Sequence, residues 1–193
     1  MKLLTALVLA FGLMSPGQSP ETYQSLETDL QKYIVRLPPA AFTELPANLV
    51  RELQRRQCTI PQEAFSPANT KKANNVIKSE FARPGQTDWA VLCSVKGIST
   101  ILVFWNGSEK NPAALAPWKD SNYLQGDGGG QYAYSRRIEP MGMADIVRYH
   151  DPDHLGEPLP PIDHQGINDQ FNGKAFLVWY YSDGQWLKVA GGD

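Results

Sequence analysis

The sequence predicts an α+β domain in which two N-terminal helices pack on a mainly antiparallel β-sheet built from hairpins. Apolar residues recur at helical spacing within residues 21–57, and strand-like runs fill much of the rest of the chain. Two pairs of these runs are joined by short links that contain glycine, at residues 96–97 and 182–184. Because the helices come first and the strands follow, parallel β-α-β units are not expected.

The chain has 193 residues, of which 42% are hydrophobic and 20% are charged. These values are typical of one globular domain, which we place at residues 20–193. The formal net charge of −2 supplies no positive field for a nucleic-acid backbone or an anionic bilayer. We therefore expect no nucleic-acid partner.

The first 19 residues have the pattern of a signal peptide. Lys2 supplies a positive charge, residues 3–14 form an apolar run, and residues 15–19 are small, polar and chain-breaking. The apolar run is too short to cross a bilayer of roughly 30 Å, so we expect no retained membrane span. A retained anchor is the alternative, but no second apolar segment supports it. The mature protein is expected in the periplasm or outside the cell.

Cys58 and Cys93 are the only cysteines of the chain. In an oxidising compartment a disulfide between them is the simplest assignment. A free catalytic thiol is the competing hypothesis, and neither cysteine lies in a recognisable nucleophile motif. Two structural thiols that never pair are the remaining alternative.

The predicted helices span residues 21–36 and residues 46–57. The first carries apolar side chains three and four residues apart, and the prolines at 38 and 39 end it. In the second, Leu49, Val50 and Leu53 are expected to point inward.

The two predicted hairpins lie at residues 88–105 and residues 175–189. Neither strand of the first hairpin alternates cleanly, so both of its faces are expected to be covered. Further strands are predicted at residues 76–77, 132–138 and 143–149, and the stretch 106–130 is predicted to be a long loop.

The segment from residue 150 to residue 166 concentrates the histidines of the chain among prolines. Imidazole and carboxylate groups are zinc ligands, but their spacing here matches no known metal motif. We expect the loop from His150 to Asp169 to form the functional surface, with the loop tryptophan Trp118 available to stack on a ligand. The candidate binding residues are His150, Asp151, Asp153, His154, Asp163, His164 and Trp118.

Part of the central hairpin resembles one blade of an FG-GAP or VCBS-type propeller. The resemblance rests on Phe81, Gly85, residues 88–92 and residues 103–105, with a weaker echo from Phe171 onward. That family places an acidic calcium loop before the strand, whereas here residues 82–87 leave Asp88 as the only carboxylate, which argues against inherited calcium binding. The whole chain also resembles small exported bacterial proteins, a resemblance that implies no activity.

These observations favour an exported, non-enzymatic binding or inhibitor-like module without a cofactor. Its expected ligand is a protein, peptide or glycan in the cell envelope or outside the cell. The alternative is a metal-dependent hydrolase in which His150, His154 and His164 hold one divalent metal ion that activates water. A serine hydrolase is disfavoured because the sequence has no Gly-x-Ser-x-Gly motif.

Overall fold

The computed structural model describes residues 29–65, 72–126, 131–150 and 158–192, and this part of the chain is mostly β-structure. Its strands form two four-stranded and two two-stranded antiparallel sheets. The predicted α+β fold, with two N-terminal helices on one sheet, is therefore wrong. Two short α-helices, α2 (Ala47–Arg55) and α3 (Met143–Tyr149), lie wholly within the described residues, and they cover different sheets.

The first large sheet has the strand order β3-β4-β5-β6 and contains the predicted central hairpin. Its strands are β3 (Val76–Ser79), β4 (Asp88–Val95), β5 (Ile98–Phe104) and β6 (Ala113–Lys119). Lys96 and Gly97 join β4 to β5 with φ angles of 51° and 77°. Positive φ at both central residues is typical of the tight turns that match the twist of a hairpin, so the hairpin prediction is confirmed.

The second large sheet has the order β12-β11-β10-β9 and contains the predicted terminal hairpin. Its strands are β9 (Arg136–Met141), β10 (Gly166–Phe171), β11 (Ala175–Ser182) and β12 (Gln185–Gly192). Asp183 and Gly184, both at positive φ, form the turn between β11 and β12. The Asp-Gly signal in the sequence thus located this turn correctly.

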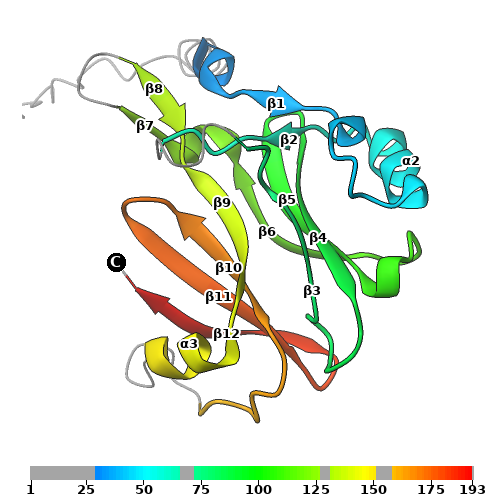
Figure 1. Ribbon diagram of the computed structural model, residues 1–193. Helices are drawn as coiled ribbons and strands as arrows, with labels where there is room; N and C mark the ends of the chain where they lie inside the picture. The colour runs from blue at the N-terminus through cyan, green and yellow to red at the C-terminus, as the bar shows by residue number, and fades with distance from the viewer. Residues whose placement is uncertain (1–28, 66–71, 127–130, 151–157, 193) are drawn as a thin grey trace, which may run out of the picture.

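The two large sheets pack face to face, with one helix on each outer side (Figure 1). Successive side chains of β4 point to opposite faces of the first sheet. Ala90 and Leu92 point toward the second sheet, whereas Val91 and Cys93 point toward α2. Because both faces are covered, β4 reads as a continuous apolar run, as the sequence predicted.

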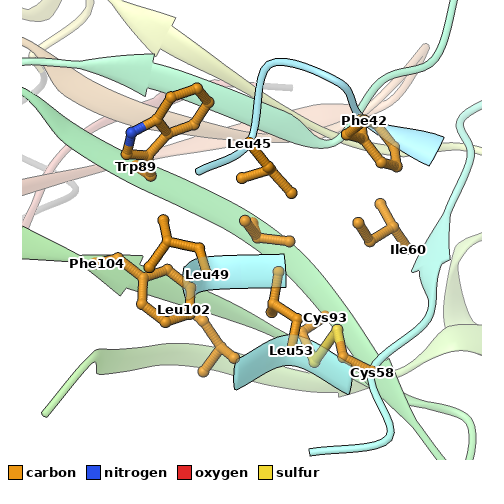
Figure 2. Packing of buried hydrophobic residues seen from close by; sticks show 11 residues of the cluster. Phe42, Leu45, Leu49, Leu53, Cys58, Ile60, Trp89, Cys93, Leu102 and Phe104 are labelled. Atoms are coloured by element: carbon orange, nitrogen blue, oxygen red, sulfur yellow. A yellow bond between two sulfur atoms is a disulfide. The ribbon is translucent and has the colours of Figure 1, made fainter. Parts of the chain in front are cut away.

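The α2 helix covers the outer face of the first sheet with Leu49 and Leu53, which are both fully buried (Figure 2). The disulfide between Cys58 and Cys93 ties the chain just after α2 to β4. On the opposite side of the molecule, α3 packs on the second sheet through Ile146.

Two smaller sheets lie beside the sandwich. The strands β1 (Arg36–Leu37) and β2 (Ile60–Pro61) form one pair, and β7 (Leu124–Gly126) and β8 (Tyr132–Tyr134) form the other. Short 3-10 helices occur at Gln31–Tyr33, Pro39–Ala41, Trp105–Gly107 and Asp120–Tyr123.

Three local predictions are wrong. The predicted first helix ends earlier than expected, because helical residues 29–30 pass into a 3-10 turn and β1 begins at Arg36, while residues 21–28 lie outside the described part. The predicted strand at residues 143–149 is helix α3, because a seven-residue apolar run does not by itself distinguish a strand from a short helix. The predicted loop at residues 106–130 contains β6 and β7.

Asn75 joins the two large sheets along one side of the sandwich. Its side-chain amide donates hydrogen bonds to the carbonyls of Pro61 (2.7 Å) and Arg136 (3.1 Å), and its Oδ1 accepts one from the amide of Ile138 (2.9 Å). Asn75 has a φ of 68°, a conformation that asparagine tolerates better than most residues. We call this connection between the β3 and β9 sides the seam.

Candidate functional site: an aromatic cavity

Away from the seam, a cavity of about 550 Å³ opens between β6 and the inner face of the second sheet. We call it the aromatic cavity because five aromatic side chains line it. The lining residues are Ala116, Pro117, Trp118, Tyr123, Asp169, Phe171, Ala175, Phe176, Leu177, Trp179 and Lys188. Its volume lies within the range of small-molecule binding sites, which is roughly 300–1,000 Å³.

An irregularity in the edge strand β6 places Trp118 at the cavity. The pairing of β5 with β6 shifts between Ser99 and Ile101, and Ala116 opposite this point has a φ of 47°. Pro117 is tolerated here because β6 is an edge strand and the irregularity needs no ladder hydrogen bond from its nitrogen. Trp118, which is 53% exposed, follows directly and lines the cavity. Such bulges are a common means of redirecting a side chain.

Below the cavity wall, a buried ion pair joins β9 to β10. Asp169 accepts hydrogen bonds from Arg136 at both carboxylate oxygens, from Nε at 2.9 Å and from Nη2 at 2.8 Å. The same guanidinium donates from Nη1 to the carbonyl of Ser99 at 3.1 Å and from Nη2 to the carbonyl of Ala116 at 2.9 Å. One arginine thus connects both large sheets directly behind the cavity.

The electrostatics of this ion pair keep the Arg136 guanidinium charged. Burial acts to lower the pKa of Arg136, but its hydrogen bonds to Asp169 and the charge of that carboxylate outweigh burial and raise the pKa. The Tyr123 ring lies 4.9 Å from the Arg136 guanidinium carbon, and burial raises the pKa of the Tyr123 hydroxyl. Tyr123 is therefore a neutral wall of the cavity at physiological pH.

Lys188 provides an additional positive charge at the rim of the cavity. It pairs across the strands with Trp179, and its ammonium nitrogen lies 5.4 Å from the centre of a Trp179 ring. Among the described residues, no carboxylate lies within ion-pair distance of this ammonium group. Lys188 is exposed, so it can reach a bound ligand.

The predicted histidine loop is only partly described. Asp151, Asp153 and His154 lie outside the described residues. His150 directs its Nδ1 to the carbonyl of Val189 at 2.7 Å, whereas His164 contacts a different strand, β11, through Tyr180.

His164 and Asp163 form a pair against the outer face of the second sheet. His164 is 6% exposed, its ring stacks on Tyr180 with the ring centres 4.3 Å apart, and its Nδ1 lies 2.6 Å from an Asp163 carboxylate oxygen. The hydrogen bond from His164 lowers the pKa of Asp163. The His164 Nε2 is buried and has no hydrogen-bond partner.

In the described ranges, no three His, Cys, Asp or Glu side chains are grouped so that they could hold a metal ion. The structure therefore does not bring His150 and His164 into a common ligand set within those ranges. Of the predicted binding residues, Trp118 lines a cavity of ligand size.

Most residues of the aromatic cavity were not predicted from the sequence. The sequence predicts Asp169 only as the end of the histidine loop, whereas the structure places it in β10. It predicts Phe171 only as the lead-in to the terminal hairpin, and Leu177, Trp179 and Lys188 only as strand residues of that hairpin. Alternation along β11 was the available signal, because Ala175, Leu177 and Trp179 share one face.

Asp88, the carboxylate in the FG-GAP-like segment, forms hydrogen bonds within the protein at both of its oxygens. It is fully buried, and one oxygen accepts hydrogen bonds from the backbone amides of Phe81 and Ala82 at 3.1 and 3.0 Å. The other oxygen accepts from the Gln86 side chain and the Asn106 backbone amide, both at 2.8 Å. Asp88 thus organises the two loops that flank β4 and β5, and the family resemblance stays a prediction.

The fold and site define this protein as a two-sheet β-sandwich with an aromatic cavity at its open side. No protein-family model, no curated protein and no solved structure matches the chain. In the part of the chain that the structure describes, no helix is long and apolar enough to cross a membrane.

Proposed function

We propose that this protein is an exported, non-enzymatic binding module that holds its ligand in the aromatic cavity. The observation that carries the proposal is the combination of five aromatic walls with few polar groups in a space of about 550 Å³. Small-molecule sites are characteristically concave, mostly apolar and equipped with a few polar groups that fix orientation. Extracytoplasmic location is supported by the disulfide, because such bonds persist in oxidising compartments.

The test is a binding screen of the mature protein followed by NMR. A library of aromatic, aliphatic, sugar and short-peptide compounds is added to the protein, and the indole signals of Trp118 and Trp179 are monitored. We expect at least one chemical class to shift these signals in a saturable manner, since both indoles line the cavity.

Matched variants decide whether the binding occurs in the cavity. Ala175→Trp adds a large ring to the cavity wall and should abolish binding. Ala114→Trp adds the same ring to the exposed surface of β6, outside the cavity, and should leave binding intact. Binding that survives Ala175→Trp, or a library without any binder, contradicts the proposal.

A second candidate function is the metal-dependent hydrolase. The Nδ1 of His164 is held by Asp163, an arrangement that orients metal-binding histidines and leaves the other ring nitrogen for the ion. Elemental analysis of the purified mature protein tests this hypothesis. A stoichiometric divalent ion that is lost on His164→Ala would favour the hydrolase, and a metal-free protein that gains no stability from added zinc would rule it out.

A further inference from the structure

We infer that the aromatic cavity selects an aromatic monocarboxylate, whose rings lie among the aromatic walls and whose carboxylate pairs with Lys188. This inference rests on the proposed binding function and adds the chemical class of the ligand. It follows from the charge of the cavity, from the shortage of polar groups in its lining and from the position of Lys188.

The charges at the cavity sum to one unpaired positive charge. The carboxylate of Asp169 is neutralised by Arg136, which contacts both of its oxygens. Burial raises the pKa of Tyr123, so this side chain contributes no negative charge. Lys188 is left as the charge without an acidic partner among the described residues. A ligand that carries one negative charge complements this arrangement.

The lining favours a ring system over a sugar. Besides the indole N–H groups, Tyr123, Asp169 and Lys188 supply the polar side-chain groups of the cavity, and Asp169 already accepts two hydrogen bonds. A sugar ring carries several hydroxyl groups, and each one that is buried without a hydrogen-bond partner reduces affinity. A flat aromatic ligand has no such requirement and can stack on Trp118, Phe171 or Trp179.

The position of Lys188 indicates that a carboxylate of the ligand would fix the orientation of the ligand in the cavity. The pairing of β11 with β12 shifts between Val178 and Trp179, and beyond this irregularity Lys188 lies directly opposite Trp179. Its ammonium nitrogen lies 5.4 Å from the centre of a Trp179 ring, while the side chain remains exposed. A ring packed against Trp179 therefore brings a carboxylate on its edge toward the Lys188 ammonium.

The experiment uses 2-naphthoate and its neutral analogue 2-naphthamide as probes. The two molecules share ring system and size, and the carboxylate is ionised at pH 7. Isothermal titration calorimetry on the mature protein should give a dissociation constant about fivefold lower for 2-naphthoate, because an ion pair with an exposed lysine contributes up to about this factor.

Variants of Lys188 test the origin of that preference. Lys188→Gln should bind the two probes with dissociation constants within about twofold of each other, whereas Lys188→Arg should keep the preference for the anion. Lys78→Gln is the matched control, because Lys78 also lies over a tryptophan, Trp89, at 5.6 Å, and is remote from the cavity lining. This control should keep the full preference.

The outcomes separate this inference from the proposed function. If both probes bind equally to the unmodified protein and Ala175→Trp abolishes their binding, the cavity binds ligands but the charge selection is wrong. A preference that survives Lys188→Gln also overturns the inference. If neither probe binds, the inference fails, and the library screen alone then decides the proposed function.

Discussion

Arg136 is the largest fully buried side chain among the described residues, and its charge shapes the interior of the sandwich. Its guanidinium connects β5, β6 and β10 through Ser99, Ala116 and Asp169. A buried ion pair does not guarantee net stabilisation, but removal of one partner leaves an uncompensated charge in a medium of low polarity. Packing of the two sheets around Arg136 therefore requires the negative charge of Asp169.

Asp169→Asn should destabilise the protein by about 3 kcal/mol or more, because it keeps the shape of the side chain but leaves Arg136 without a counter-charge. Chemical denaturation monitored by tryptophan fluorescence measures this change. Glu139→Gln is the control, since Glu139 pairs with Arg137 on the outer face of β9, the strand of Arg136, and its side chain is 39% exposed. This change should cost less than about 1 kcal/mol. Equal losses in the two variants would contradict the prediction.

The pair of Asp163 and His164 should give a measurable pH dependence. The pKa of Asp163 is lowered below its ordinary value of 3.8, mainly by the hydrogen bond from His164. A carboxyl group with a lowered folded-state pKa stabilises the protein above its ordinary pKa, and this contribution is lost as the pH falls through the folded pKa. Carbon-13 NMR of the carboxyl groups should show the low pKa.

His164→Phe should move the pKa of Asp163 back toward its ordinary value, because the new ring can still stack on Tyr180 but donates no hydrogen bond. An unchanged titration of Asp163 in this variant would show that His164 is not the cause.

At the scale of elements, the sequence predicted those features whose signals are local. The two hairpins were predicted because each combines apolar strands with a turn containing glycine. Helix α2 was predicted because Leu49 and Leu53 lie on one helical face. Strand β6 was missed because Pro117 reads as a loop residue unless the strand is known to be an edge.

Gly166, the first residue of β10, allows α3 and β11 to approach the strand closely. A Cβ atom at this position would lie 2.9 Å from both the Trp179 carbonyl oxygen and Val178 Cγ1, and 3.2 Å from Ile146 Cδ1. Gly166→Ala should therefore cost about 1–3 kcal/mol of stability, measured by thermal or denaturant unfolding. Gly126→Ala in β7, whose nearest contact would be 3.8 Å, should change stability by less than about 0.5 kcal/mol. Similar losses at the two positions would refute the explanation.

At the scale of the whole molecule, the two large sheets are connected at the seam, and the aromatic cavity lies away from the seam. Asn75 forms the seam from a position with positive φ. The sequence could not predict this geometry, because Asn75, Arg136 and Ile138 are brought together only when both sheets are complete. The aromatic cavity could not be predicted for the same reason. Trp118 and Trp179 line it from two different sheets, whereas the sequence predicts a single sheet.

Asn75→Gly should weaken the seam without straining the backbone, because glycine accepts positive φ. The loss of hydrogen bonds to Pro61, Arg136 and Ile138 should cost about 2–4 kcal/mol. Amide hydrogen exchange should accelerate in β3 and β9 more than in β5. Asn111→Gly is the control, since Asn111 is exposed at a φ of 50°. Uniform acceleration over both sheets would argue against a local role for the seam.

The irregular strand β6 has a further consequence for the behaviour of the protein at high concentration. Exposed sheet edges can pair with edges of other molecules and grow into fibrils. Pro117 offers no N–H group for such pairing, and the bulge at Ala116 interrupts the ladder beside it. The feature that delivers a tryptophan to the cavity therefore also protects this edge against self-association, so a chain with a regular, proline-free β6 would be more prone to aggregate.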